Sequence, residues 1–105
     1  MIDPNHATTV QHTVAFRLND GVDQAAFLTA CQGLAVIDGV VDFEVLEQVG
    51  AKASYTHALS MWFVDQAAYD HYNDHPDHQH FVHNVWLPQV AEFVELDYQR
   101  HGRNR

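Results

Sequence analysis

The order of apolar and polar residues predicts four β-strands and two helical regions. In the segment 9–18, apolar residues and His12 alternate with mostly polar residues, which is the period-two pattern of a strand with one buried face. The same period predicts strands over 40–48, 55–64 and 91–98. In the second of these strands it places Val41, Phe43 and Val45 on one face. Apolar residues at helical spacing predict a helix over about 23–34, capped by Asp20 or Asp23.

The second helical region is divided at Pro76. Asp65 is a suitable N-cap for a helix through Asn73, and Pro76 disfavours helical geometry in the residue before it. Proline fits the first turn of a new helix, where its missing N–H group is no loss. We therefore predict a helix that begins at Pro76 and ends at Pro88. Its buried side is expected to carry His78, Phe81, Val82 and Val85.

This order of elements, β-α-β-β-α-β, predicts an α+β protein with one four-stranded antiparallel sheet and helices on one face, the ferredoxin-like arrangement. We expect the domain to span 9–99, between an N-terminal arm (1–8) and a basic C-terminal tail (100–105). By strand parity, the other face of the sheet carries Ala15, Ala58, Trp62, Val64, Val94, Leu96 and Tyr98. This face is too apolar for contact with water in a monomer. We therefore predict a homodimer that packs sheet to sheet around a barrel-like centre.

Composition narrows the classes of partner. The chain has 105 residues and a formal net charge of −9, with only five lysines and arginines. Nucleic acids and anionic membranes bind basic surfaces, so neither is an expected partner. No apolar run reaches the roughly 18 residues of a membrane span and no signal-peptide core is visible, so we expect a cytoplasmic protein. The single cysteine, Cys31, excludes an internal disulfide and is expected to be a small buried hydrophobic residue.

Five stretches resemble the stress-responsive dimeric α/β-barrel (Dabb) family over about residues 9–99. They are 12–18, Gly39–Val40, 55–63, 72–81 and 96–98, and the most specific is a His75-Pro76-Asp77-His78 corner preceded by Tyr72. The resemblance implies the fold derived above and a homodimer. One plant member, olivetolic acid cyclase, closes a linear polyketide thioester by an intramolecular aldol step without a metal. Tyr72 and His78 match its catalytic tyrosine and histidine, and His12, His57 and Asp97 match polar positions around that site.

The residues themselves support a pocket between sheet and helices. His12 and His57 are each the single ionisable residue on an apolar strand face, and because their strands are neighbours we expect their imidazoles to be close. A neutral histidine in an apolar pocket is a suitable base, and a tyrosine hydroxyl can stabilise a developing oxyanion. His78 is thus the predicted base and Tyr72 the donor. In the alternative interpretation, these histidines and Tyr72 only stabilise the core and the corner through hydrogen bonds.

The density of histidines near the corner also raises the question of a metal site. His80 and His83 are one helical turn apart, a usable ligand spacing, but they fall on the solvent side of the predicted helix. We therefore predict no metal ligands and no cofactor.

The predicted function is that of a cofactor-free Dabb protein whose pocket binds a small hydrophobic ligand that contains a carbonyl group. If it is an enzyme, the expected reaction is proton abstraction next to a carbonyl, as in the aldol cyclisation of a polyketide-like substrate. One alternative is a non-catalytic stress-response or ligand-binding dimer. A further alternative is a cofactor-free monooxygenase of the related dimeric barrels.

Overall fold

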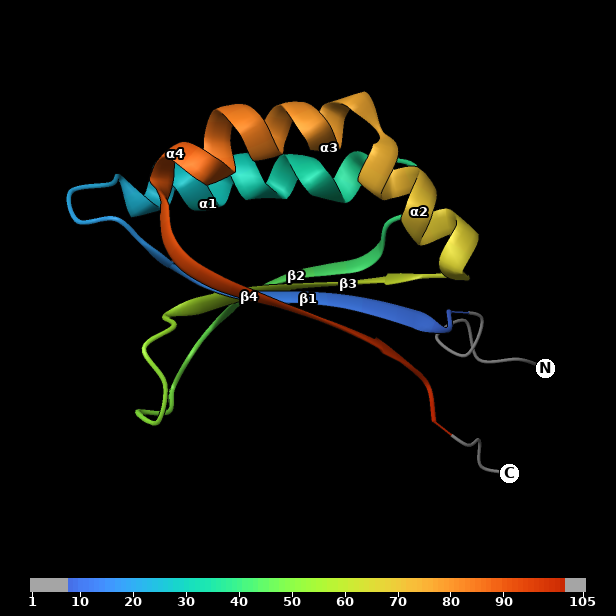
Figure 1. Ribbon diagram of the computed structural model, residues 1–105, viewed down its shortest axis with the longest axis horizontal. Coiled ribbons are helices and arrows are strands. Elements are labelled where there is room, and N and C mark those ends of the chain that lie inside the picture. Colours follow the sequence, from blue (N-terminus) through green and yellow to red (C-terminus); the bar gives the residue numbers. More distant parts are fainter. Residues whose placement is uncertain (1–7, 102–105) are drawn as a thin grey trace.

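The computed structural model describes residues 8–101, in which the helices lie on one face of a four-stranded sheet (Figure 1). The predicted N-terminal arm falls outside the described residues apart from Thr8, and the predicted basic tail falls outside them apart from Arg100 and His101. The bounds of the domain between them, 9–99, stay a prediction.

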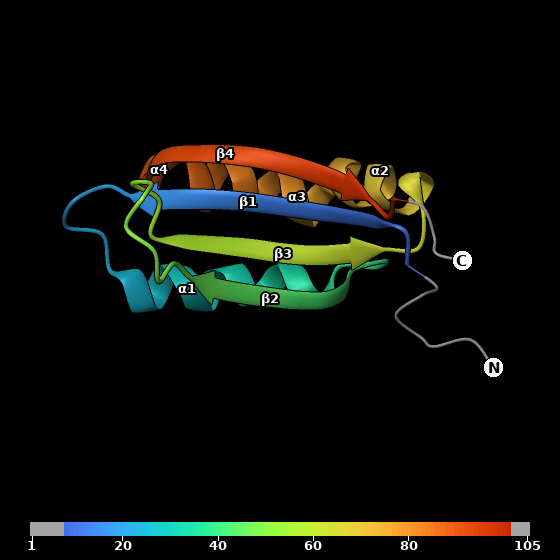
Figure 2. The ribbon, with the colours of Figure 1, turned by 90° about the horizontal axis from the view of Figure 1, so that it is seen from below.

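The four strands are antiparallel to their neighbours and lie in the order β2-β3-β1-β4 (Figure 2). They are β1 (Val10–Leu18), β2 (Val41–Glu47), β3 (His57–Phe63) and β4 (Val90–Gln99). With helices in the two crossover connections, this order confirms the predicted α+β, ferredoxin-like fold. In the central strand β1, His12 lies opposite Met61 of β3 and Asp97 of β4. This register decides which polar residues meet beneath the helices.

The described residues contain six helical segments, which are α1 (Gln24–Gln32), η2 (Gly33–Val36), α2 (Gln66–Asp74), α3 (Pro76–Phe81), η3 (Val82–Trp86) and α4 (Leu87–Gln89). Two of them, α1 and α2, begin at side-chain caps that the sequence indicates. Asp23, rather than Asp20, caps α1 and accepts a hydrogen bond from the Ala26 amide at 3.0 Å. Asp65 caps α2 in the same way, through the Ala68 amide at 2.9 Å. Among the described residues, no helix is long and apolar enough to cross a membrane.

The last helical region differs from the prediction in its final turns. It does not end at Pro88, because Pro88 lies in the first turn of α4, where a proline is tolerated, and the helix continues to Gln89. The segment η3 before it is a π-helical turn, which contains more residues per turn than an α-helix. The wider turn changes which residues face the sheet. Trp86 becomes the buried anchor at 6% exposure, whereas Val82 and Val85 are only half-buried.

The predicted face assignment in β2 is wrong for one residue. Val41 lies opposite Trp62, whereas Val45 lies opposite Leu59, so these two valines occupy different faces of the sheet. The register shifts between Val41 and Glu44, and Asp42 has a φ of +53°. An extra residue in one strand forms a bulge and reverses the alternation beyond it. Val41 therefore joins the sheet face that points away from the helices.

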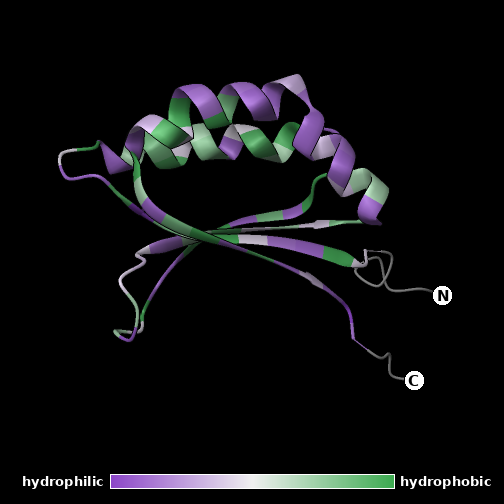
Figure 3. Cartoon of the chain, in the orientation of Figure 1, coloured by the Kyte–Doolittle hydropathy of each residue, from purple (hydrophilic) through white to green (hydrophobic). Residues whose placement is uncertain are grey.

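Aromatic rings dominate the core between the two layers. Phe16 of β1 packs against Phe27 of α1 and Trp86 of η3, with ring centroids 5.6 and 5.0 Å apart. Phe63 of β3 packs against Tyr72 of α2 at 5.2 Å. Hydrophobic and hydrophilic residues are interspersed along α1 and along the second helical region taken as a whole, as expected for helices with one buried side (Figure 3). These contacts hold α1, α2 and η3 against one face of the sheet, and the candidate site lies between the two layers.

Candidate functional site

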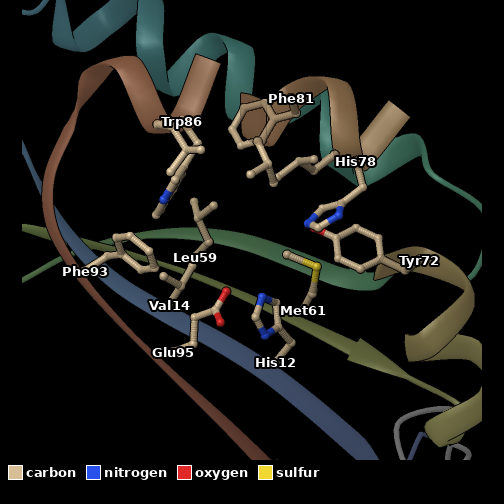
Figure 4. Close-up of a pocket in the computed structure, with 13 residues that line it drawn as sticks. His12, Val14, Leu59, Met61, Tyr72, His78, Phe81, Trp86, Phe93 and Glu95 are labelled. Carbon is tan, nitrogen blue, oxygen red and sulfur yellow. The ribbon is translucent and has the colours of Figure 1, made fainter. Parts of the chain in front are cut away.

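A cavity of about 100 Å³ lies between the sheet and the second helical region (Figure 4). Most of its wall is apolar and comes from Val14, Leu34, Leu59, Met61, Phe81, Val82, Trp86, Leu87 and Phe93. Four side chains that can exchange protons or bear charge complete it: His12, Tyr72, His78 and Glu95. An apolar hollow with a few convergent polar groups is the usual form of a small-molecule site.

Tyr72 and His78 meet at the corner that Pro76 creates. Tyr72 projects from the last turns of α2, His78 from the first turn of α3, and their ring centroids are 4.5 Å apart. The Nδ1 atom of His78 lies 3.0 Å from the carbonyl oxygen of Asn73, which can only accept a hydrogen bond. Nδ1 therefore carries the proton, and Nε2 of the neutral ring holds a free lone pair.

Burial sets the protonation states of this pair. Desolvation lowers the pKa of His78 below its ordinary value, and the hydrogen bond to the Asn73 carbonyl opposes this effect only in part. Desolvation raises the pKa of Tyr72, whose side chain is only 1% exposed, well above that of a free phenol. At neutral pH the site thus pairs a neutral imidazole with a protonated hydroxyl group, which is the combination that a base and an oxyanion donor require.

His12 is held by a polar cluster at the edge of the cavity. Its Nδ1 atom lies 2.6 Å from Oδ1 of Asp97 and 2.9 Å from the hydroxyl oxygen of Tyr69. The Tyr69 hydroxyl donates its own hydrogen to Oδ2 of Asp97 at 2.9 Å. The Asp97 carboxylate and the Tyr69 hydroxyl oxygen can therefore both accept a hydrogen bond from an Nδ1–H group of His12. When the His12 ring is neutral, this places its proton on Nδ1 and its lone pair on Nε2. Asp97 contacts His12 and does not line the cavity itself.

His57 is the predicted site residue that the fold places elsewhere. It is buried, but it lies opposite Phe16, whereas Met61 lies opposite His12. His57 and Met61 are four positions apart in the strand, which is about 13 Å along β3. His57 stacks on Phe16 with ring centroids 5.9 Å apart, and its Nδ1 lies 2.8 Å from Oγ1 of Thr56. The prediction that the two imidazoles are close is wrong, because it considered neighbouring strands without their register.

Two polar residues of this region were not predicted from the sequence, Tyr69 and Glu95. Tyr69 precedes Tyr72 by three residues and so shares its side of α2. Glu95 precedes Asp97 by two residues and so shares its face of β4. The same periodicities that placed the apolar residues would have found both.

The corner histidines on the solvent side are arranged differently. His80 and His83 are exposed, and Nδ1 of His80 lies 3.1 Å from the side-chain nitrogen of Asn84. His75 caps α3, since its Nδ1 atom accepts a hydrogen bond from the Asp77 amide at 3.1 Å. Within residues 8–101, no group of three or more His, Cys, Asp or Glu side chains could hold a metal ion.

Comparison with known proteins identifies relatives that share both sequence and fold. Residues 10–100 match the model of the stress responsive A/B barrel domain. The structure is similar to that of a Dabb family protein with a ferredoxin-like fold from Mesorhizobium loti, with a TM-score of 0.86 and 42% sequence identity. That match covers 90% of this chain and 99% of the other. A search of the curated proteins finds no match.

Two more distant structures share the fold. A dimeric ferredoxin-like protein of unknown function from Thermobifida fusca has a TM-score of 0.74 at 24% identity, over 89% of this chain and 92% of the other. A hydroxynitrile lyase from Passiflora edulis has a TM-score of 0.80 at 18% identity, over 91% of this chain and 96% of the other. The family match spans nearly the whole described chain and agrees with the resemblance seen in the sequence. The chain belongs to the stress-responsive A/B barrel domain (Dabb) family.

Proposed function

We propose that this protein is an enzyme that removes a proton next to the carbonyl group of a small substrate, with His78 as the base and Tyr72 as the oxyanion donor. The observation that carries the proposal is the pair itself: the rings lie 4.5 Å apart in one cavity, and burial favours the neutral imidazole and the protonated phenol. Proton transfer needs both states together.

The steps follow from the two side chains. Nε2 of His78 takes a proton from the carbon next to the carbonyl, and the electron pair of the broken C–H bond moves onto the carbonyl oxygen. The Tyr72 hydroxyl donates a hydrogen bond to that oxygen. In an aldol cyclisation, the enolate carbon then attacks a second carbonyl of the same molecule and forms a C–C bond. The new alkoxide recovers the proton from the His78 imidazolium.

His12 is the proposed orienting residue. Asp97 and Tyr69 hold its Nδ1 proton, so its Nε2 atom can accept a hydrogen bond from a hydroxyl group of the substrate. Asp97 acts through His12 and is therefore a positioning residue. His57 lies outside the cavity, and a role in substrate binding is not part of this proposal.

The size of the cavity favours a smaller substrate than a long polyketide. Its volume is about 100 Å³, whereas sites for drug-sized ligands usually measure about 300–1,000 Å³. The part of the substrate that reacts must fit among Met61, Phe81 and Trp86, which favours a carbonyl compound of a few carbons.

Exchange of hydrogen for deuterium tests the proposal directly. We expect the protein to accelerate the exchange of the protons next to the carbonyl of 2-butanone in D₂O, measured by proton NMR. Because the pKa of His78 is lowered, its base form persists below the usual histidine range, and the rate should fall only as pH decreases below about 6.5. No acceleration over the same concentration of free imidazole, or a midpoint above that pH, would contradict the assignment.

A second candidate function uses the same pair. The fold is shared with a hydroxynitrile lyase, and a base beside a hydroxyl donor also suits the cleavage of a small hydroxynitrile. His78 would take the hydroxyl proton, the electron pair would form the carbonyl, and the C–C bond would break to release cyanide, which leaves with the proton. Release of cyanide from acetone cyanohydrin distinguishes this reaction from enolate formation.

We further propose that the protein is a homodimer that packs through the sheet face opposite the helices. This face carries Val41, Leu46, Leu96 and Tyr98 at 38–51% exposure, with Trp62 among them. Apolar surface of this kind on a single chain usually marks an interface. The related proteins from Thermobifida fusca and Bacteroides fragilis are described as dimeric, which supports the same assembly here.

A charge on this face should dissociate the dimer. We expect Leu96→Glu to yield a monomer at micromolar concentration, because two symmetry-related carboxylates would be buried without partners. Sedimentation equilibrium measures the mass of wild type and variant. Val36→Glu, which changes an exposed residue of η2, is the control and should remain dimeric. A monomeric wild type, or a dimeric Leu96→Glu protein, would contradict the proposal.

A further inference from the structure

Glu95 is the cavity residue to which the proposed reaction assigns no role. It lies on β4 opposite Val14, two residues from Asp97, and Figure 4 shows its carboxylate directed into the same space as the His12 ring. Its residue as a whole is exposed to solvent, so the carboxylate stands at the open side of the cavity. Burial is the main cause of the lowered pKa of His78. The negative charge of Glu95 raises that pKa, so the Glu95 carboxylate interacts electrostatically with the His78 ring across the cavity.

No positive side chain balances this carboxylate among the described residues that line the cavity. Within residues 8–101, no lysine or arginine lines the cavity. Arg17 instead pairs with Glu92 at 3.3 Å, and the guanidinium of Arg100 lies over the Trp62 ring at 4.1 Å. His78 is neutral at pH 7 because burial lowers its pKa. His12 also lines the cavity, but its Nδ1 atom is already paired with the Asp97 carboxylate at 2.6 Å.

We propose that Glu95 determines the charge of the substrate, so that the cavity accepts small carbonyl compounds that are neutral or carry an amine and rejects those that carry a carboxylate or phosphate. This inference rests on the proposed function and narrows its substrate class. A substrate anion bound in the cavity would stand close to the Glu95 carboxylate with no lysine or arginine beside it, whereas a hydroxyl or ammonium group could donate a hydrogen bond to Glu95. The net charge of −9 also disfavours the approach of anionic compounds, at longer range.

Two ligands of equal size and different charge test the inference. Acetylacetone is neutral, and acetoacetate replaces one of its acetyl groups by a carboxylate. Dissociation constants from NMR titration of their methyl signals should favour acetylacetone by about threefold in the wild type, a modest value because Glu95 is exposed to solvent. In Glu95→Gln this preference should largely disappear. Glu92→Gln, which removes the same charge from the same strand outside the cavity, should keep it.

The outcomes separate this inference from the proposed reaction. Equal affinity of the wild type for both ligands, or an unchanged preference in Glu95→Gln, overturns the role of Glu95. Binding of acetylacetone without acceleration of 2-butanone exchange overturns the proposed reaction and leaves the charge selection standing. If acetylacetone does not bind at millimolar concentration, the charge selection by Glu95 is wrong, and the exchange of 2-butanone protons still decides the proposed reaction.

Discussion

Replacing His78 by glutamine is expected to slow the exchange of 2-butanone protons by about 10²–10⁴-fold, the usual contribution of a positioned general base. Glutamine is similar in length to histidine and its amide can donate to the Asn73 carbonyl, so the corner at Pro76 keeps its hydrogen bond. The amide has no basic lone pair, so only the proton acceptor is lost. Exchange rates at pH 7.5, followed by NMR, measure the effect.

The matched control is His83→Gln. His83 lies in η3 of the same helical region but is exposed and does not line the cavity. The exchange rate of this variant should stay within about twofold of wild type, since surface substitutions away from special features have small effects. If both variants exchange at the wild-type rate, another group is the base and His78 only stabilises the corner.

Changing Tyr72 to phenylalanine is expected to lower the rate at saturating substrate by about 10²–10³-fold, as the loss of one oxyanion donor usually does. The substitution removes only the hydroxyl group. The ring should keep its packing against Phe63 and His78, so thermal unfolding should change little. The Michaelis constant should change much less than the rate, because the hydrogen bond strengthens only as charge develops on the oxygen.

Two other results for Tyr72→Phe would have different meanings. A wild-type rate would show that the hydroxyl group takes no part in the reaction. A raised Michaelis constant with an unchanged rate at saturation would mean that Tyr72 binds the ground state and the transition state equally. The second result would keep Tyr72 in the site but remove its assignment as oxyanion donor.

The sequence predicted the features that depend on local pattern. The corner follows from Pro76, which both ends α2 and begins α3, so the proximity of Tyr72 and His78 could be expected without coordinates. The alternation along β1 likewise placed His12 on the buried face. Each of these inferences needs only neighbours in the chain.

Features that depend on strand register could not be obtained in this way. The register of β3 and β4 against β1 decides whether His12 lies opposite Asp97 or beside His57. A shift of two residues leaves the same side chains on the buried face, so the period-two pattern alone cannot distinguish such registers. The bulge at Asp42 is a related case, since one inserted residue reversed the face of Val41. The π-helical turn η3 likewise changed which side of the helix faces the sheet, and it made Trp86 a core residue.

The hydrogen bonds of Tyr69 connect α2 of the helical layer directly to the sheet. Tyr69 lies one turn from Tyr72 on α2, and its hydroxyl contacts His12 of β1 and Asp97 of β4. For α2 to slide over the sheet, it would have to break both bonds, of which the one to His12 is buried and the one to Asp97 is partly buried. The distance between Tyr72 and the sheet is thus set by contacts within the protein itself. Binding would then cost little conformational entropy, and a compound of the wrong shape would be excluded instead of accommodated.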